Sequence, residues 1–331
     1  MALDPGRRPS LHAAKLRGLS RAALGLELTD ATGSAEGALG RVDDRVVCLV
    51  ESAPERSVGK TLASMKRHDA VRADLLCADG ADLVARRAAC FDLDLHVHAV
   101  DDTTLSPVDD SPDPMPTAPS GEALSWIDTI ERSGADVVVE HGLVTGEVAG
   151  LEVARVIEDE FGVRLEVGVS ADDRIMFSLL HGHLGADDAM ARIIEIVREH
   201  RRPGAIDHPL NRLSRSRWLR SMLVDRPRAI GMSSLSPAPA PVPRANLKDV
   251  VPAAALGMQD DREVVVAVST GVDLDVVPFG AHARRTLSPD AELVIVVPER
   301  DAVPFLGWAV DRLHHPARVV TVSDGWSDEL G

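Results

Sequence analysis

The sequence contains no tyrosine, and only four of its 36 basic residues are lysine: Lys15, Lys60, Lys66 and Lys248. Phenylalanine and tryptophan are also scarce, with five and four residues in a chain of 331. A hydrophobic core must therefore be built mainly from valine, leucine, isoleucine and alanine. Arginine in place of lysine, together with abundant acidic residues, is typical of a GC-rich bacterial proteome and carries no information about function.

Long apolar runs are missing as well. No run approaches the roughly 20 residues that a membrane-spanning helix needs, and no apolar segment follows the first arginines as in a secretory signal. The three cysteines, Cys48, Cys77 and Cys90, are odd in number and form no CxxC pair, which argues against disulfides and a structural zinc site. We expect an acidic cytoplasmic protein with buried thiols and no membrane contact.

Two proline-rich stretches, at 106–120 and 233–245, divide the chain. Alternating prolines fix φ and remove hydrogen-bond donors, so both stretches are expected to be extended connectors. The predicted segments are 1–105, 121–232 and 246–331.

Strand-like and helical patterns alternate in the first and third segments. Strand-like runs include ALGLEL (23–28), RVVCLVE (45–51) and ELVIVVP (292–298). Such alternation predicts βαβ units and a mainly parallel sheet. We therefore predict an α/β fold, with two outer βαβ-type segments that share or pack their sheets and a central α+β segment with a hairpin-like centre. The third segment, of about 85 residues, is too small for a core of its own and is expected to dock on the first.

Charge is polarised within the central segment. Ten acidic residues and two arginines lie between Asp136 and Asp173, whereas nine arginines and three acidic residues lie between Arg198 and Arg228. Carboxylates of the first half could hold a divalent metal while arginines of the second half bind phosphate. Alternatively, the two halves neutralise each other and otherwise form solvated helix faces.

Acidic and histidine side chains in or beside the strand-like runs are the candidate metal ligands. A charge is costly inside a sheet, so these side chains must face solvent, a partner or a metal. The candidates are Glu140, Glu147, Glu152, Glu166, His181 and His183. The metal would be magnesium, manganese or zinc. The two histidines are equally consistent with a glycine-containing turn.

The stretch HRRPGAIDHPLNRLSRSRWLR (200–220) is the candidate phosphate-binding surface, with one stacking ring at Trp218. Its predicted phosphate ligands are Arg201, Arg202, Arg212, Arg215 and Arg217. The partner would be a nucleic acid or a phosphorylated ligand, although the net charge of −16 leaves only a local patch to attract it. The prolines also allow a wrapping loop held by salt bridges.

The run VAVSTGVDLD (266–275) resembles a degenerate SGGxDS pyrophosphate-binding loop of ATP pyrophosphatases. Ser269, Gly271 and Asp273 match that motif, and the position between a strand and a helix suits phosphate capture by backbone amides. Pro278 is expected to interrupt the following helix, which favours a structural turn.

Two wider resemblances concern larger parts of the chain. Residues 122–200 resemble the PD-(D/E)xK nuclease-like core, which would imply metal-dependent phosphodiester hydrolysis, but Val167 and Gly168 follow Glu166 where that motif has its lysine. The phrases VVEHGLVTGEVAGLEVARV, HRRPGAIDHPLNRL and RANLKDVVPAAALG are similar to an actinobacterial family without an assigned activity.

Three functions follow from these patterns. The first is a metal-dependent phosphodiesterase or nuclease-like domain, active or inactive. The second is a non-catalytic scaffold that binds a protein partner. The third is an α/β protein that binds a nucleotide or another small ligand at the carboxyl ends of its strands.

Overall fold

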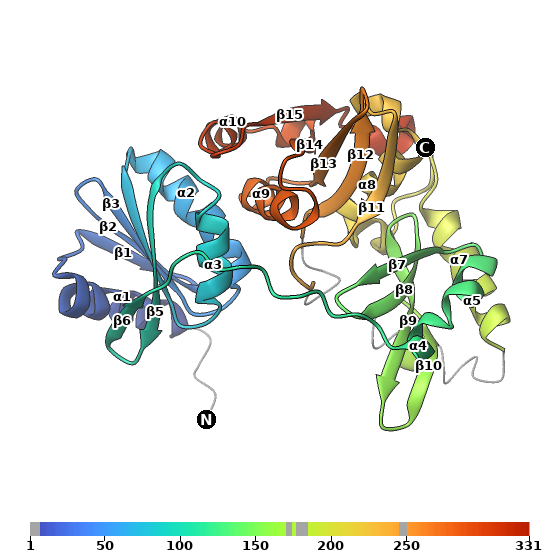
Figure 1. Ribbon diagram of the computed structural model, residues 1–331, viewed down its shortest axis with the longest axis horizontal. Helices are drawn as coiled ribbons and strands as arrows, with labels where there is room; N and C mark the ends of the chain where they lie inside the picture. Colours follow the sequence, from blue (N-terminus) through green and yellow to red (C-terminus); the bar gives the residue numbers. More distant parts are fainter. Residues whose placement is uncertain (1–6, 170–173, 177–184, 245–249, 331) are drawn as a thin grey trace. The chain divides into compact units, whose positions relative to one another are not determined.

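Three β-sheets, of six, four and five strands, form the framework of the chain (Figure 1). The structure is a computed structural model that describes residues 7–169, 174–176, 185–244 and 250–330. Its mixed helices and strands confirm the predicted α/β class. The chain divides into two compact units. Unit 1 comprises Met1–Asp113, Leu274–Thr286 and Val303–Val319, and unit 2 comprises Pro114–Asp273, Leu287–Ala302 and Val320–Gly331.

Unit 1 contains the six-stranded sheet, in the order β1-β2-β3-β4-β5-β6. Its strands are β1 (Asp30–Gly33), β2 (Gly37–Val42), β3 (Arg45–Val50), β4 (Arg72–Cys77), β5 (Asp94–Asp101) and β6 (Thr104–Pro107). Strands β3, β4 and β5 are parallel, and the outer strands pair antiparallel. The middle strands are almost continuously apolar because both faces of a parallel sheet are covered.

Three helices of unit 1 pack on this sheet: α1 (Arg8–Leu24) on β1 and β2, α2 (Ser57–His68) on β3 and β4, and α3 (Ala81–Ala88) on β4 and β5. Leu16 and Leu19 of α1 share a core with Leu49. The strand predicted at 23–28 is wrong, because α1 continues to Leu24 and ends at Gly25, which has a left-handed φ of 67°. Glycine takes this conformation without steric cost, which explains the helix end.

The third segment contributes to both units. Strands β12 and β14 belong to unit 2, whereas most of α9 (Val276–Leu287) and all of α10 (Pro304–Val310) belong to unit 1. The middle of the first proline-rich stretch is held on α9. The Asp113 carboxylate accepts hydrogen bonds from His282 Nε2 at 2.7 Å and from Arg285 Nε at 2.9 Å.

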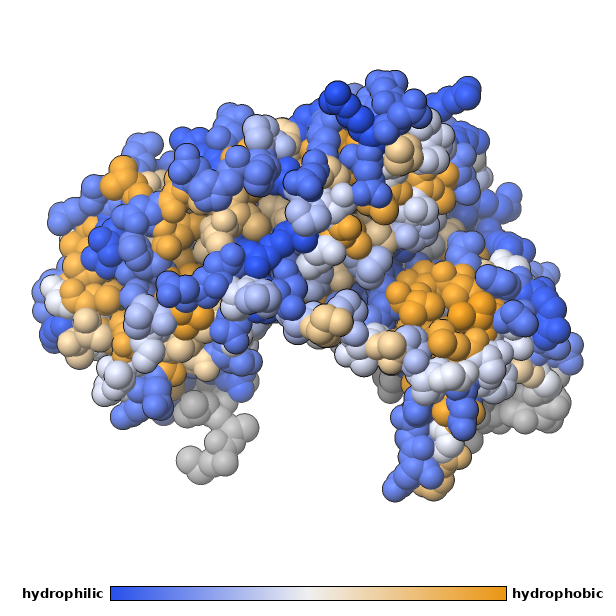
Figure 2. Space-filling view, in the orientation of Figure 1, coloured by the Kyte–Doolittle hydropathy of each residue, from blue (hydrophilic) through white to orange (hydrophobic). Residues whose placement is uncertain are grey.

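The four-stranded sheet of unit 2 is an antiparallel meander, which is the hairpin-like centre that the sequence predicted. Its strands are β7 (Asp136–Glu140), β8 (Leu143–Val148), β9 (Leu151–Asp159) and β10 (Gly162–Val167), in the order β10-β9-β8-β7. Helices α4 (Gly121–Leu124), α5 (Ile127–Arg132) and α7 (Ala186–His200) pack against it. Figure 2 shows apolar residues gathered over this part of unit 2, where Val139 and Leu143 are 41% and 40% exposed.

The five-stranded sheet has the order β11-β12-β13-β14-β15. Its strands are β11 (Ser234–Ala238), β12 (Ala253–Gln259), β13 (Arg262–Val268), β14 (Glu292–Pro298) and β15 (Ala317–Val322). Strands β13 and β14 are parallel, whereas β11, β12 and β13 pair antiparallel. Helix α8 (Arg215–Asp225) packs on β11, β12 and β13 through a core that includes Trp218 and Leu223.

Strand β11 occupies part of the second proline-rich stretch, which the sequence predicted to be a connector. Pro237 pairs with Ala255 in the sheet. An edge strand tolerates proline because one side of it needs no ladder donor. The remaining short helices are η1 (Pro54–Arg56), η2 (Pro209–Arg212), η3 (Pro227–Ile230), η4 (Glu299–Asp301) and α11 (Trp326–Glu329). Within the described ranges, no helix has the length and apolar character needed to cross a membrane.

His282 makes the stability of unit 1 dependent on pH. Its ring is 1% exposed, and burial lowers the pKa of His282 to about 4, although Asp113 opposes this change. Between pH 7 and pH 4 the unfolded chain binds a proton here that the folded chain does not bind, so stability falls as pH falls. The difference between 6.5 and about 4 corresponds to a loss of about 3 kcal/mol.

Urea unfolding at pH 7 and pH 4.5 tests this prediction. The His282→Gln variant should lose less stability on acidification than the parent, because glutamine does not titrate. His68→Gln, at an exposed histidine of α2, is the matched control and should follow the parent. Equal losses in the parent and in His282→Gln would contradict the prediction.

Candidate functional site

A pocket of about 240 Å³, lined by arginines and apolar residues, lies in unit 2 at the carboxyl ends of the parallel strands β13 and β14. The loop after β13 contributes Thr270 and Gly271, and η4 after β14 contributes Arg300. The residues Ser214–Arg217, at the start of α8, form another wall. This end of an open α/β sheet is where such sheets generally bind ligands.

Five arginines line this cavity, which we call the arginine pocket: Arg212, Arg215, Arg217, Arg244 and Arg300. None of the described lining residues is acidic. Ala240, Val250, Val251 and Pro252 add an apolar portion. The pocket thus combines several positive charges with a surface that can contact a nonpolar group.

The amino terminus of α8 opens into the arginine pocket without a side-chain cap. Ser214 precedes the helix with a left-handed φ of 46°, and its hydroxyl accepts a hydrogen bond from Arg244 Nη1 at 2.7 Å. The first amides of a helix have no intrahelical acceptor, and the helix dipole favours negative charge beside them. An anion in the pocket would satisfy both conditions.

Two hydroxyl-bearing residues also contribute to the arginine pocket. Ser216 and Thr270 are only 3% and 5% exposed as residues, and both line the pocket. Their hydroxyl groups can donate to an acceptor oxygen of a ligand.

Arg215 and Arg300 repel each other in the pocket and differ in their partners. The Arg215 guanidinium lies 5.4 Å from the centre of the Trp326 ring and has no ion pair among the described side chains. Arg300 Nε lies 3.9 Å from Asp301 Oδ1 and 4.0 Å from Asp324 Oδ1, which are long contacts. Burial, and then repulsion from Arg300, lower the pKa of Arg215. A bound anion would relieve this repulsion.

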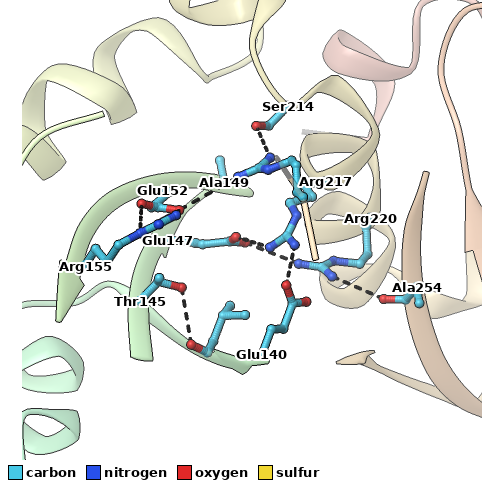
Figure 3. Close-up of polar contacts among 12 residues, drawn as sticks. Glu140, Thr145, Glu147, Ala149, Glu152, Arg155, Ser214, Arg217, Arg220 and Ala254 are labelled. Carbon is cyan, nitrogen blue, oxygen red and sulfur yellow. Dashed lines mark hydrogen bonds and ion pairs between the residues drawn. The ribbon is translucent and has the colours of Figure 1, made fainter. Parts of the chain in front are cut away.

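Beneath the arginine pocket, the carboxylate of Glu147 joins β8 to α8. Glu147 is 2% exposed and accepts hydrogen bonds from Arg217 and, at 3.2 Å, from Arg220 (Figure 3). Arg217 also donates to Glu140 Oε2 at 2.5 Å. Burial alone would raise the pKa of Glu147, but the two guanidinium groups lower it overall. Both ends of this buried contact are therefore charged.

Glu152 and Glu166, the other predicted carboxylate ligands, also face arginines. Glu152, 3% exposed, accepts two hydrogen bonds of 2.9 Å from Arg155 and one of 3.3 Å from Arg174 (Figure 3 shows the Arg155 pair). Glu166 accepts from Arg164 at 2.8 Å. A neighbouring guanidinium competes with a metal for the same oxygens.

The predicted metal site thus stays a prediction. In the described part of the chain, no three histidine, cysteine or carboxylate side chains converge as metal ligands. His181 and His183 lie outside the described residues.

Three of the predicted phosphate ligands, Arg212, Arg215 and Arg217, line the arginine pocket, and two do not. Arg201 is 6% exposed and donates to the carbonyls of Ala149 and Leu210, at 2.7 and 2.9 Å. Burial lowers the pKa of Arg201 to about 9. Arg202 is exposed and donates to the Glu199 carbonyl at 3.2 Å.

Sequence reasoning missed Arg244, Arg300, Ser216 and Thr270. The available signal was the run at 266–275, which places Thr270 and Gly271 at a strand end. Gly271 has a φ of 83°, and its amide donates to Asp301 Oδ2 at 2.7 Å. The expectation that Pro278 interrupts the next helix is wrong, because Pro278 lies in the first turn of α9, where no amide donor is needed.

The chain matches no protein-family model, and the searches of curated proteins and of solved structures found no similar protein. The nuclease-like and actinobacterial resemblances therefore stay predictions. The function must be argued from the geometry of the site.

Replacing Glu147 by glutamine should destabilise unit 2. The change leaves Arg217 and Arg220 buried without their shared charge, and breaking a buried ion pair typically costs about 3–5 kcal/mol. Urea unfolding followed by tryptophan fluorescence measures the loss, since Trp218 is a buried residue of α8. Glu160→Gln, at an exposed position, is the control and should unfold like the parent.

A loss below about 1 kcal/mol, the range of surface ion pairs, would show that the contact does not hold α8. The measurement is repeated with a chelator. A metal held by Glu147 would make the effect of the substitution depend on the chelator, whereas the arginine contacts would not.

Proposed function

We propose that unit 2 binds a phosphorylated small ligand in the arginine pocket. One observation carries the proposal: the uncapped start of α8, five arginines and the hydroxyl-bearing residues Ser216 and Thr270 surround the same cavity. Each of these groups stabilises negative oxygen atoms. This function corresponds to the third alternative from the sequence, a ligand at the carboxyl ends of the strands.

Phosphate suits the cavity better than other anions. The guanidinium group presents its donors in a planar fork that matches the oxygens of phosphate, and Ser216 and Thr270 can donate to further oxygens. A volume of about 240 Å³ lies below the roughly 300–1,000 Å³ of pockets for drug-sized ligands. The ligand is therefore small, and Val250, Val251 and Pro252 can contact its nonpolar part.

The contacts give less support to a nucleic-acid surface along 198–228. Arg201, Arg217 and Arg220 are 6%, 9% and 2% exposed, so these side chains are not available to an extended phosphate backbone. The metal-dependent phosphodiesterase requires carboxylates that converge on a metal. The described glutamates are instead paired with arginines. We therefore favour ligand binding.

Isothermal titration calorimetry with phenyl phosphate tests the proposal, because this probe combines a phosphate with a nonpolar ring. Binding is expected for the parent chain. Arg300→Gln should weaken it about 10- to 100-fold, as expected when one hydrogen bond to a charged group is lost. The Arg300 side chain is 59% exposed, so the variant should fold normally.

Arg228→Gln removes an equal charge from an exposed position of η3 outside the pocket and serves as the control. Its affinity should equal that of the parent. Absence of heat and of thermal stabilisation with millimolar phosphate, pyrophosphate and phenyl phosphate would reject the proposed function.

A further inference from the structure

We infer that the arginine pocket selects phosphomonoesters over phosphodiesters, an inference that rests on the proposed binding of a phosphorylated ligand in this pocket. Both ester classes carry phosphorus and oxygen, but they differ in charge, in the number of free oxygens and in the number of substituents. Each difference corresponds to one feature of the pocket: its charge, its hydrogen-bond donors or its walls.

The charge of the pocket favours a dianion. Four of the five arginines have carboxylates nearby. Arg212 lies 3.1 Å from Asp207, Arg244 lies 3.8 Å from Glu152, Arg217 contacts Glu140 and Glu147, and Arg300 lies 3.9 and 4.0 Å from Asp301 and Asp324. Arg215 has no ion pair among the described side chains. A phosphomonoester carries a charge of about −1.5 to −2 at pH 7 and is attracted to this group of arginines more strongly than a diester, which carries one negative charge.

The donors of the pocket favour three terminal oxygens. The guanidinium groups of Arg215 and Arg300, the hydroxyls of Ser216 and Thr270, and the first amides of α8 are all donors. A monoester presents three terminal oxygens to them, and a diester presents two. A diester would leave one of these donors without a ligand oxygen, which weakens its binding relative to the monoester.

The walls of the pocket favour a single substituent. Ser214–Arg217 bound one side, Thr270 and Gly271 another, and Val250–Pro252 a third. A monoester needs room for one group, which the apolar residues can contact. A diester needs room for a second group where the donors converge, and that group would displace an oxygen from them.

Calorimetry with a matched pair of ligands tests the inference. Phenyl phosphate and methyl phenyl phosphate share the ring and differ by one methyl group on a terminal oxygen. At pH 7.5 the monoester should bind about 10- to 100-fold more tightly. Its affinity should fall on going to pH 5, because the second ionisation of a monoester has a pKa of about 6, whereas affinity for the diester should stay constant.

Substitutions of single arginines test which side chains produce the preference for the monoester. Arg300→Gln and Arg215→Gln should each lower the monoester-to-diester affinity ratio, because each removes one positive charge and its donors from the pocket. Arg215 also contacts Trp326, so the thermal unfolding of the Arg215→Gln variant is compared with that of the parent. If Arg215→Gln is destabilised, the affinity ratio of Arg300→Gln alone tests the inference. The ratio should not change in Arg228→Gln, the exposed control.

An oligonucleotide with and without a 5′-phosphate identifies the source of the monoester. Each oligonucleotide competes with phenyl phosphate for the pocket. If only the phosphorylated form competes, with an affinity equal to that of phenyl phosphate, the ligand is the terminus of a nucleic acid. If it competes only weakly, the ligand is a small ester. Equal affinity for the two phenyl esters would overturn the selectivity while leaving phosphate binding intact. Failure of both to bind would instead refute the proposed function.

Discussion

The carboxylate of Glu147 holds two arginines in the interior of unit 2, and the arginine pocket depends on that contact. Arg217 and Arg220 extend from α8, and Glu147 extends from β8. Separation of these elements would leave buried charges without partners, which is strongly unfavourable. The contact therefore fixes the first turn of α8 and, with it, the positions of Arg215 and Ser216.

Gly150 permits the close approach that this contact requires. It lies in the turn between β8 and β9 with a φ of 71°, and a Cβ at this position would come within 2.3 Å of the Arg217 carbonyl. No other residue fits there without moving α8. A backbone position and a buried ion pair thus act together to set the geometry of the pocket.

The inner and outer arginines of α8 differ in their partners, and the proposed anion binding depends on this difference. The net charge of −16 disfavours long-range attraction of anions. Within the site, glutamates neutralise Arg217 and Arg220, while Arg215 keeps its charge available. In the proposed function, recognition comes from short-range, directional hydrogen bonds rather than from long-range steering.

The sequence by itself determined the α/β class, strands such as β3 and β14, and the polarity of charge in the central segment, because these follow from local periodicity and composition. Tertiary structure decided which charges meet. Glu147 and Arg217 are 70 residues apart, and no local pattern distinguishes an arginine that pairs with a glutamate from one that faces a cavity. Arg300 joins the pocket only because β14 lies parallel to β13, a pairing between distant segments. Long-range strand pairing and buried charge pairing thus placed the site.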